Sequence, residues 1–331
     1  MKKIKFFLVG AMLATLASCG TTEKVPLTGR THRIGVSDAR ILSLSSEEYS
    51  KFMASAKKST NTANTKMVER VGHRLATAVE TYLRNNGYAN EIQNFAWEFN
   101  LIQDKQANAF CMPGGKIVVY EGIFPYTQNE ASLAVVLGHE IAHAVAKHSA
   151  EQWTKQNNQS IGTSILGTVL NSTVGNGVGD IAAQVASGYF SFRNLKYSRS
   201  DESEADYMGL IFAAMAGYDP QSAVPFWQRM AAATKSSSSE FFSDHPSDER
   251  RIANIQKWMP EALKYYQAAK GTTTKTTVLS LKVCKLFFSF ILVISIFLYF
   301  LPTFELVYFS FVSPFSFLHC YGTQEKDDRL C

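Results

Sequence analysis

Residues 137–149 constrain the fold of this 331-residue chain more than any other stretch, because they place two histidines four positions apart in an apolar segment. In an α-helix, positions i and i+4 differ by about 40° around the axis and about 6 Å along it. His139 and His143 would therefore share one face and could bind a single zinc ion. Glu140 would lie beside them as a general base for an attacking water. The pattern indicates a zinc-dependent endopeptidase, although His-Glu-x-x-His also occurs by chance in unrelated chains.

A zinc site with two histidines needs a third ligand, and residues 199–209 offer one. Asp201 and Glu204 have the spacing of a capping box, which predicts the start of a helix. Glu202 and Asp206 would share a face of that helix. We predict Glu202 as the third ligand, and Asp206 as the group that holds the second ring nitrogen of a histidine. The alternative is a solvated acidic helix start that complements the helix dipole.

The segments around the motif predict helices over 46–58, 62–86 and 128–149, with Asn129 as the cap of the last. Residues 95–103 alternate and predict a strand. His148 follows His143 by about 500° of helical rotation, so the same geometry predicts a structural role for it.

The turn Pro113-Gly114-Gly115 precedes a short β-branched run. We predict that Ile117, Val118, Val119 and Tyr120 form an edge strand beside the active-site helix and hydrogen-bond an extended substrate by strand addition. A hairpin that only completes a small sheet is the alternative.

Composition excludes some other classes of function. With 46% hydrophobic and 18% charged residues, the chain can bury a sizeable core. It has no Lys/Arg block interleaved with aromatic residues, so nucleic-acid binding has no support. The five cysteines form no Cys-x-x-Cys pair and imply no disulfide framework.

Four motifs follow one another along the chain: Asn108-Ala109-Phe110 with Pro113-Gly114-Gly115, His139-Glu140-x-x-His143, Glu202-x-Glu204-Ala205-Asp206-x-x-Gly209, and His245-Pro246 followed by Arg251-Ile252. As a set they resemble the HtpX-like and CAAX prenyl protease family of zinc metallopeptidases, and in particular its soluble periplasmic and lipoprotein members. The resemblance covers roughly residues 28–268.

The resemblance implies an α+β, mainly helical, zincin-like fold with a small sheet whose edge strand lines the active-site cleft. It implies one Zn²⁺ per chain, held by His139, His143 and Glu202, with Glu140 as general base. It also implies that His245 covers the metal as a latch or stabilises the transition state, and that Arg251 lies near the cleft. The implied substrates are unfolded or misassembled envelope proteins; the rival function is a latched scaffold that acts mainly as an envelope chaperone or assembly factor.

The N-terminal residues predict export. Residues 1–18 combine a lysine-rich start with a short apolar stretch, as in a signal peptide. Leu16-Ala17-Ser18-Cys19 resembles a bacterial lipobox, which would make Cys19 a lipidated membrane tether facing the periplasm; an ordinary cleaved signal is the alternative. No acidic residue follows Cys19 directly, which favours the outer membrane over the inner. We predict a tether and entry segment over 19–45 and the peptidase domain over 46–271.

The C-terminal residues add a linker at 272–278 and a hydrophobic tail at 279–331. Residues 279–301, with an apolar core from Leu286 to Leu301, are long enough to span a bilayer. The lysines before this core would lie on the outside, against the positive-inside tendency. A membrane anchor, an unstructured tail and an extension from a shifted reading frame remain open.

Overall fold

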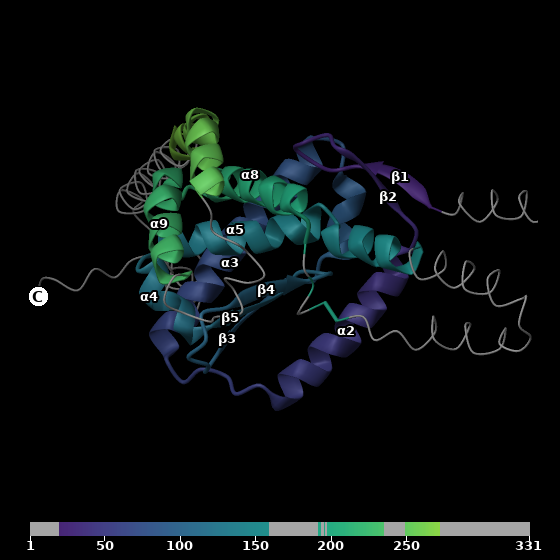
Figure 1. Ribbon diagram of the computed structural model, residues 1–331, viewed down its shortest axis with the longest axis horizontal. Helices are drawn as coiled ribbons and strands as arrows, with labels where there is room; N and C mark the ends of the chain where they lie inside the picture. Colours follow the sequence, from purple (N-terminus) through teal and green to yellow (C-terminus); the bar gives the residue numbers. More distant parts are fainter. Residues whose placement is uncertain (1–19, 159–190, 193–194, 196, 235–248, 272–331) are drawn as a thin grey trace, which may run out of the picture. The chain divides into compact units, whose positions relative to one another are not determined.

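The computed structural model describes residues 20–158, 191–192, 195, 197–234 and 249–271 (Figure 1). They all belong to the first of the two units into which the chain divides, Met1–Thr273. This part of the chain is mainly helical with two small sheets, which confirms the α+β class. The predictions for residues 1–18, Cys19, the linker and the tail lie outside the described residues. Within the described ranges, no helix is both long and apolar enough to cross a bilayer.

The labelled helices are α2 (Asp38–Ser55), α3 (Thr62–Asn85), α4 (Phe124–Thr127), α5 (Glu130–Val145), α8 (Arg199–Met215) and α9 (Ala223–Thr234). Two further helical stretches cover 148–158 and 249–271. Short 3₁₀ helices are η1 (Ala89–Asn94), η2 (Glu121–Ile123) and η3 (Pro220–Ser222). The strands are β1 (Thr21–Lys24), β2 (Thr31–Ile34), β3 (Glu98–Ile102), β4 (Ala109–Met112) and β5 (Lys116–Tyr120).

The three-stranded sheet separates two layers of helix (Figure 1). Successive side chains of a strand point to opposite faces. Ile117 and Val119 of β5 join the core formed with α3 and α5, whereas Val118 and Tyr120 join a second core with α2. Both faces of β5 are therefore buried, which explains its continuous apolar sequence.

β5 is the central strand, so the prediction that Ile117, Val118, Val119 and Tyr120 form an edge strand is wrong. The sheet order is β3-β5-β4, with β3 parallel and β4 antiparallel to β5. The sequence indicates a β4–β5 hairpin, but it does not indicate that β3 pairs on the far side of β5. Among the strands that the structure describes, the free edge beside α5 belongs to β4, which packs against that helix.

The N-terminal residues are part of the folded unit, and from Thr21 on the range predicted as a tether and entry segment over 19–45 forms regular structure. β1 and β2 form an antiparallel hairpin. Val25, Ile34 and Ile41 are buried. α2 starts at Asp38 behind the N-cap Ser37, so the predicted boundary between 45 and 46 falls inside this helix. The buried apolar residues here are too widely spaced to give a periodic signal, so the sequence does not indicate the hairpin or the start of α2.

The metal-binding motif lies on α5, which is shorter than the predicted helix over 128–149. Asn129 caps it as predicted, since its side chain accepts a hydrogen bond from Ser132 N at 2.8 Å. The helix ends at Val145, and Lys147 has a left-handed backbone with φ of 52°. A new helical stretch begins at His148. The predicted direction of the His148 side chain assumed one continuous helix from His143. It is therefore wrong, because the helix is broken between the two residues.

α5 and α8 approach closely because a glycine on each helix faces the other. A Cβ on Gly209 would lie 2.5 Å from the backbone nitrogen of His139, and one on Gly138 would lie 2.6 Å from the carbonyl oxygen of Gly209. Any side chain at either position would push the helices apart. The two glycines thus set the distance between the two helices that carry the predicted ligands.

We expect Gly209→Ala to destabilise the protein by about 1–3 kcal/mol, because the added methyl group overpacks a backbone contact. Chemical denaturation with a far-ultraviolet circular dichroism signal measures this change. Gly271→Ala is the matched control, because a Cβ there meets no atom within 4 Å; it should leave stability unchanged or raise it slightly. Equal stability of Gly209→Ala and the wild type would contradict the close-contact argument.

Candidate metal centre

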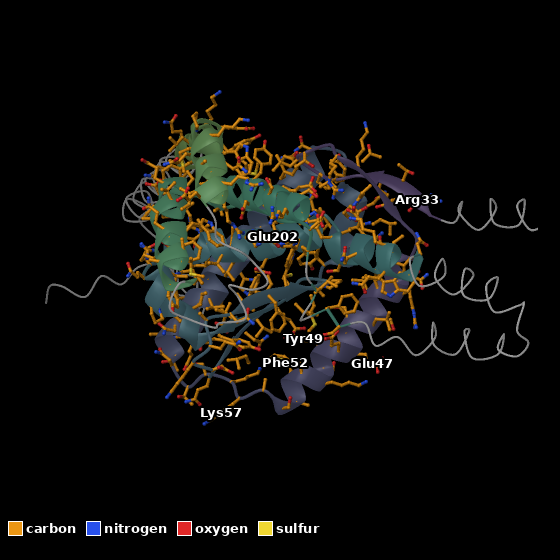
Figure 2. The ribbon with its side chains drawn as sticks, in the orientation of Figure 1. Arg33, Glu47, Tyr49, Phe52, Lys57 and Glu202 are labelled. Atoms are coloured by element: carbon orange, nitrogen blue, oxygen red, sulfur yellow. The ribbon has the colours of Figure 1, made fainter. Side chains whose placement is uncertain are left out.

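Three predicted ligands meet between α5 and α8. His139 and His143 lie one turn apart on α5, and Glu202 comes from the first turn of α8. Their side chains lie in the interior, with residue exposures of 2%, 1% and 8%. Glu202 is labelled in Figure 2, where α8 passes along α5. One ligand atom from each residue lies within 4.8 Å of the others, which is the arrangement of a metal site.

The same nitrogen of both imidazoles faces the carboxylate. His139 Nε2 lies 3.1 Å from His143 Nε2 and 3.5 Å from Glu202 Oε2. His143 Nε2 lies 3.3 Å from Glu202 Oε1. The two imidazole nitrogens and the carboxylate therefore form a compact triangle, and the Nδ1 atoms are left to contact other groups.

Asp206 and Arg251 lie behind His139. Asp206 Oδ1 is 2.9 Å from His139 Nδ1 and accepts a hydrogen bond from Arg251 Nη2 at 2.6 Å. The guanidinium of Arg251 also lies over the ring of Trp227, with Cζ 3.6 Å from the centroid. A metal on His139 Nε2 would require the proton on Nδ1, and Asp206 is placed to accept that hydrogen bond.

His148 lies behind His143, a contact that the sequence did not predict. His148 Nδ1 is 2.9 Å from His143 Nδ1, and His148 Nε2 is 3.0 Å from Glu204 Oε2. The turn at Lys147 brings the side chain back toward α5. A histidine five residues after the motif carries no periodic signal, so only the break in the helix could have indicated this position.

Glu140 lies in the same buried layer, on the side of β4. Burial raises the pKa of the Cys111 thiol on β4, and the negative charge of Glu140 raises it further. Burial also raises the pKa of Tyr197, as does the charge of Glu140, against a lowering hydrogen bond with Ser149. The Tyr197 ring stacks on His143 with centroids 4.0 Å apart. The charge of Glu140 thus acts on Cys111 of β4 and on Tyr197, whose ring stacks on the ligand His143.

The pKa values of the two histidine ligands shift in opposite directions. Burial lowers the pKa of His139, but the charges and hydrogen bonds of Glu202 and Asp206 outweigh this and raise it to about 9. Burial lowers the pKa of His143 well below its ordinary value and outweighs the hydrogen bond and charge of Glu202, which act in the opposite direction. A metal ion would displace the proton from His139 and replace its positive charge.

The start of α8 differs in detail from the prediction. Ser198 is the N-cap, and Ser198 with Asp201 forms the capping box, in place of the predicted pair Asp201 and Glu204. Glu204 instead accepts hydrogen bonds from Thr28 and Arg30. The predicted position of the helix start remains correct. His245 lies outside the described residues.

The fold and this site are those of a metalloendopeptidase: a buried His-Glu-x-x-His helix beside a small sheet, with a glutamate from a second helix. A sequence model of peptidase family M48 matches residues 62–259. The chain therefore belongs to peptidase family M48. The narrower resemblance to HtpX-like and CAAX prenyl proteases is not shown by this match.

Similar proteins carry two kinds of name. The chain is 30% identical over 255 residues to the mitochondrial metalloendopeptidase OMA1 of Saccharomyces cerevisiae, covering 74% of this chain and 71% of that protein. It is 38% identical over 174 residues to OMA1 of Schizosaccharomyces pombe, covering 52% of this chain and 49% of that protein. It is 31% identical over 189 residues to the beta-barrel assembly-enhancing protease of Yersinia pestis, covering 53% and 38%. The chain thus spans about half or less of two of these relatives.

We expect Glu202→Gln to lower the metal content of the purified full chain, because it removes an anionic ligand and leaves two neutral imidazoles. Metal analysis by plasma mass spectrometry after dialysis measures the stoichiometry. Glu261→Gln is the control. Glu261, on the helical stretch 249–271, accepts a hydrogen bond from Tyr207 of α8 and is not among the clustered ligands. An unchanged metal content in Glu202→Gln would remove Glu202 from the ligand set.

Proposed function

We propose that this protein is a zinc-dependent endopeptidase of the bacterial cell envelope, which hydrolyses peptide bonds in unfolded or misassembled envelope proteins. The observation that carries the proposal is the buried convergence of His139, His143 and Glu202, with Glu140 beside them, in a chain of peptidase family M48.

The spacing of the ligand atoms supports zinc. Tetrahedral bonds of about 2.0–2.2 Å to nitrogen and oxygen place ligand atoms about 3.3 to 3.6 Å apart. The two Nε2 atoms lie 3.1 Å apart, and the separations from His143 Nε2 and His139 Nε2 to the nearer carboxylate oxygen of Glu202 are 3.3 and 3.5 Å. Two imidazoles and one carboxylate also leave a fourth position for water, as a catalytic zinc site requires.

Each side chain at the site would have a separate role in peptide hydrolysis. When bound, the ion supplies Lewis acidity toward the carbonyl oxygen and lowers the pKa of water. Glu140 takes a proton from the attacking water while the oxygen of that water adds to the peptide carbonyl carbon. Glu140 then returns the proton to the peptide nitrogen as the C–N bond breaks. Asp206 keeps His139 oriented through Nδ1, and Arg251 holds Asp206 in turn.

β4 is the strand that we propose for binding substrate. Tyr120 N donates to Asn108 O, and paired residues in an antiparallel ladder alternate between hydrogen-bonded and non-hydrogen-bonded positions. The backbone groups of Ala109 and Cys111 therefore point away from β5. The Ala109 N–H already donates to Asn108 Oδ1 at 2.8 Å, which leaves the Ala109 carbonyl and the backbone groups of Cys111 for a substrate. An extended segment of an unfolded protein would add there as a further strand, next to Glu140.

The envelope location is supported by the N-terminal sequence and by the bacterial relatives. Cys19 follows an apolar stretch in a lipobox-like context, so we propose a lipid tether facing the periplasm, with the outer membrane favoured. The Yersinia pestis relative is named a beta-barrel assembly-enhancing protease, and this name supports our proposal of misassembled envelope proteins as substrates. The apolar tail at 279–331 would give a second membrane contact.

We expect Glu140→Gln to abolish cleavage of unfolded casein while the protein keeps its zinc, because the amide cannot accept the proton from water. Gel analysis of casein and metal analysis of the same sample measure both effects. Glu130→Gln, on the same helix but paired with Arg70 at the surface, should cleave as the wild type does. Wild-type cleavage by Glu140→Gln, or cleavage that survives removal of zinc by a chelator, would overturn the proposal.

We also expect peptides that are N-methylated at single backbone positions to reveal the strand geometry. A methyl group on a nitrogen that donates to Ala109 or Cys111 removes one hydrogen bond, so kcat/KM should fall about tenfold or more. A methyl group on the adjacent nitrogen, which faces away from β4, should have a smaller effect. Equal effects at every position near the cleaved bond would argue against substrate addition to β4.

A further inference from the structure

We infer that His148 and Glu204 position the zinc ligand His143, and that Thr28 and Arg30 hold this pair in place. The N-terminal segment that carries Thr28 and Arg30 is then part of the metal centre. The inference rests on the proposed function, because it takes His143 Nε2 as a metal ligand.

Metal binding would fix one arrangement of protons along the hydrogen-bond path that runs from His143 through His148 to Glu204. With His143 Nε2 bound to the ion, the ring proton must lie on Nδ1. His143 Nδ1–H then donates to His148 Nδ1 at 2.9 Å, which leaves the proton of the neutral His148 ring on Nε2. His148 Nε2–H donates to Glu204 Oε2 at 3.0 Å. Each atom has one role, so the carboxylate at the end determines the orientation of both rings.

Residues from the N-terminal segment hold Glu204 in turn. Thr28 Oγ1 donates to Oε1, and Arg30 Nε donates to Oε2 at 2.6 Å. A second carboxylate, Glu151, accepts from Arg30 Nη2 at 2.8 Å and fixes the other end of the guanidinium.

The same segment also holds the turn that directs His148 toward His143. Lys147, with its left-handed backbone, forms three ion pairs of 3.0 Å, with Glu23, Asp38 and Glu91. Glu23 lies on β1, close to Thr28 and Arg30 in the chain. The N-terminal hairpin therefore contacts the path to His143 at two points, once through Lys147 and once through Glu204.

The hydrogen-bond path through His148 resembles the one behind His139, because each runs from a histidine ligand to a carboxylate that an arginine holds. His139 donates to Asp206, which Arg251 holds; His143 donates through His148 to Glu204, which Arg30 holds. Partners behind a metal-bound histidine typically contribute 10–100-fold to metal affinity. We therefore expect comparable losses when the path through His148 is broken.

The test measures the zinc affinity of the full chain by competition with a chromophoric chelator, and the visible absorption of the Co²⁺-loaded protein. His148→Phe keeps a ring but removes both nitrogens, and Glu204→Gln removes the charge that orients His148. We expect each to weaken zinc binding 10–100-fold and to shift the Co²⁺ bands. Arg30→Ala should act in the same direction with a smaller effect.

Arg229→Ala is the matched control. Arg229 donates to the carbonyl oxygen of Tyr126 on α4 and to Ser132 Oγ in the first turn of α5. Its hydrogen-bond partners among the described residues include no metal ligand and none of the side chains behind the ligands. It should lower the melting temperature but leave zinc affinity and the Co²⁺ spectrum unchanged. If His148→Phe does not fold, Glu204→Gln decides the question.

The outcomes separate this inference from the proposed function. A wild-type chain that binds no zinc would refute the proposed function. A wild-type chain that binds zinc, with a folded Glu204→Gln variant of equal affinity and unchanged Co²⁺ spectrum, would overturn the inference alone. An affinity loss in Arg229→Ala equal to that in Glu204→Gln would also overturn it, because the effect would then reflect general stability.

Discussion

The close contact of α5 and α8 is the constraint on which the metal centre depends. Gly138 and Gly209 let the two backbones approach at the turn that carries His139. This approach brings Glu202, from the first turn of α8, within reach of both imidazoles. A capped start of α8 and a capped start of α5 then fix where along each helix the ligands fall. Backbone packing, rather than the ligands themselves, sets the geometry of the site.

The cost of burying charge explains why distant segments meet at this place. A buried carboxylate or imidazolium is stable only when it is paired and hydrogen-bonded. Asp206 and Glu202 lie beside Arg251, from the helix at 249–271, and Glu204 lies beside Arg30, from the N-terminal segment. The two ends of the described fold thus neutralise the acidic residues that α8 brings to the site. The metal centre and the folding of these segments are therefore coupled.

The sequence predicted the parts of the site that depend on local spacing. The i, i+4 pair on α5, the acidic residues of α8 and the cap at Asn129 all follow from helical geometry. It did not predict features that depend on the path of the chain. The left-handed Lys147 redirects His148, and the pairing of β3 with β5 moves the free edge to β4. The N-terminal hairpin has too few apolar residues to show a period, although Val25 is fully buried.

Zinc-edge X-ray absorption spectroscopy of the purified full chain tests the central claim most directly, because it reports the ligands of the ion itself. A site formed by the crossing of α5 and α8 predicts four nitrogen or oxygen neighbours at about 2.0–2.2 Å, with the multiple-scattering signal of two imidazoles. A sulfur neighbour at about 2.3 Å, or a signal of fewer than two imidazoles, would contradict a centre made of His139, His143 and Glu202.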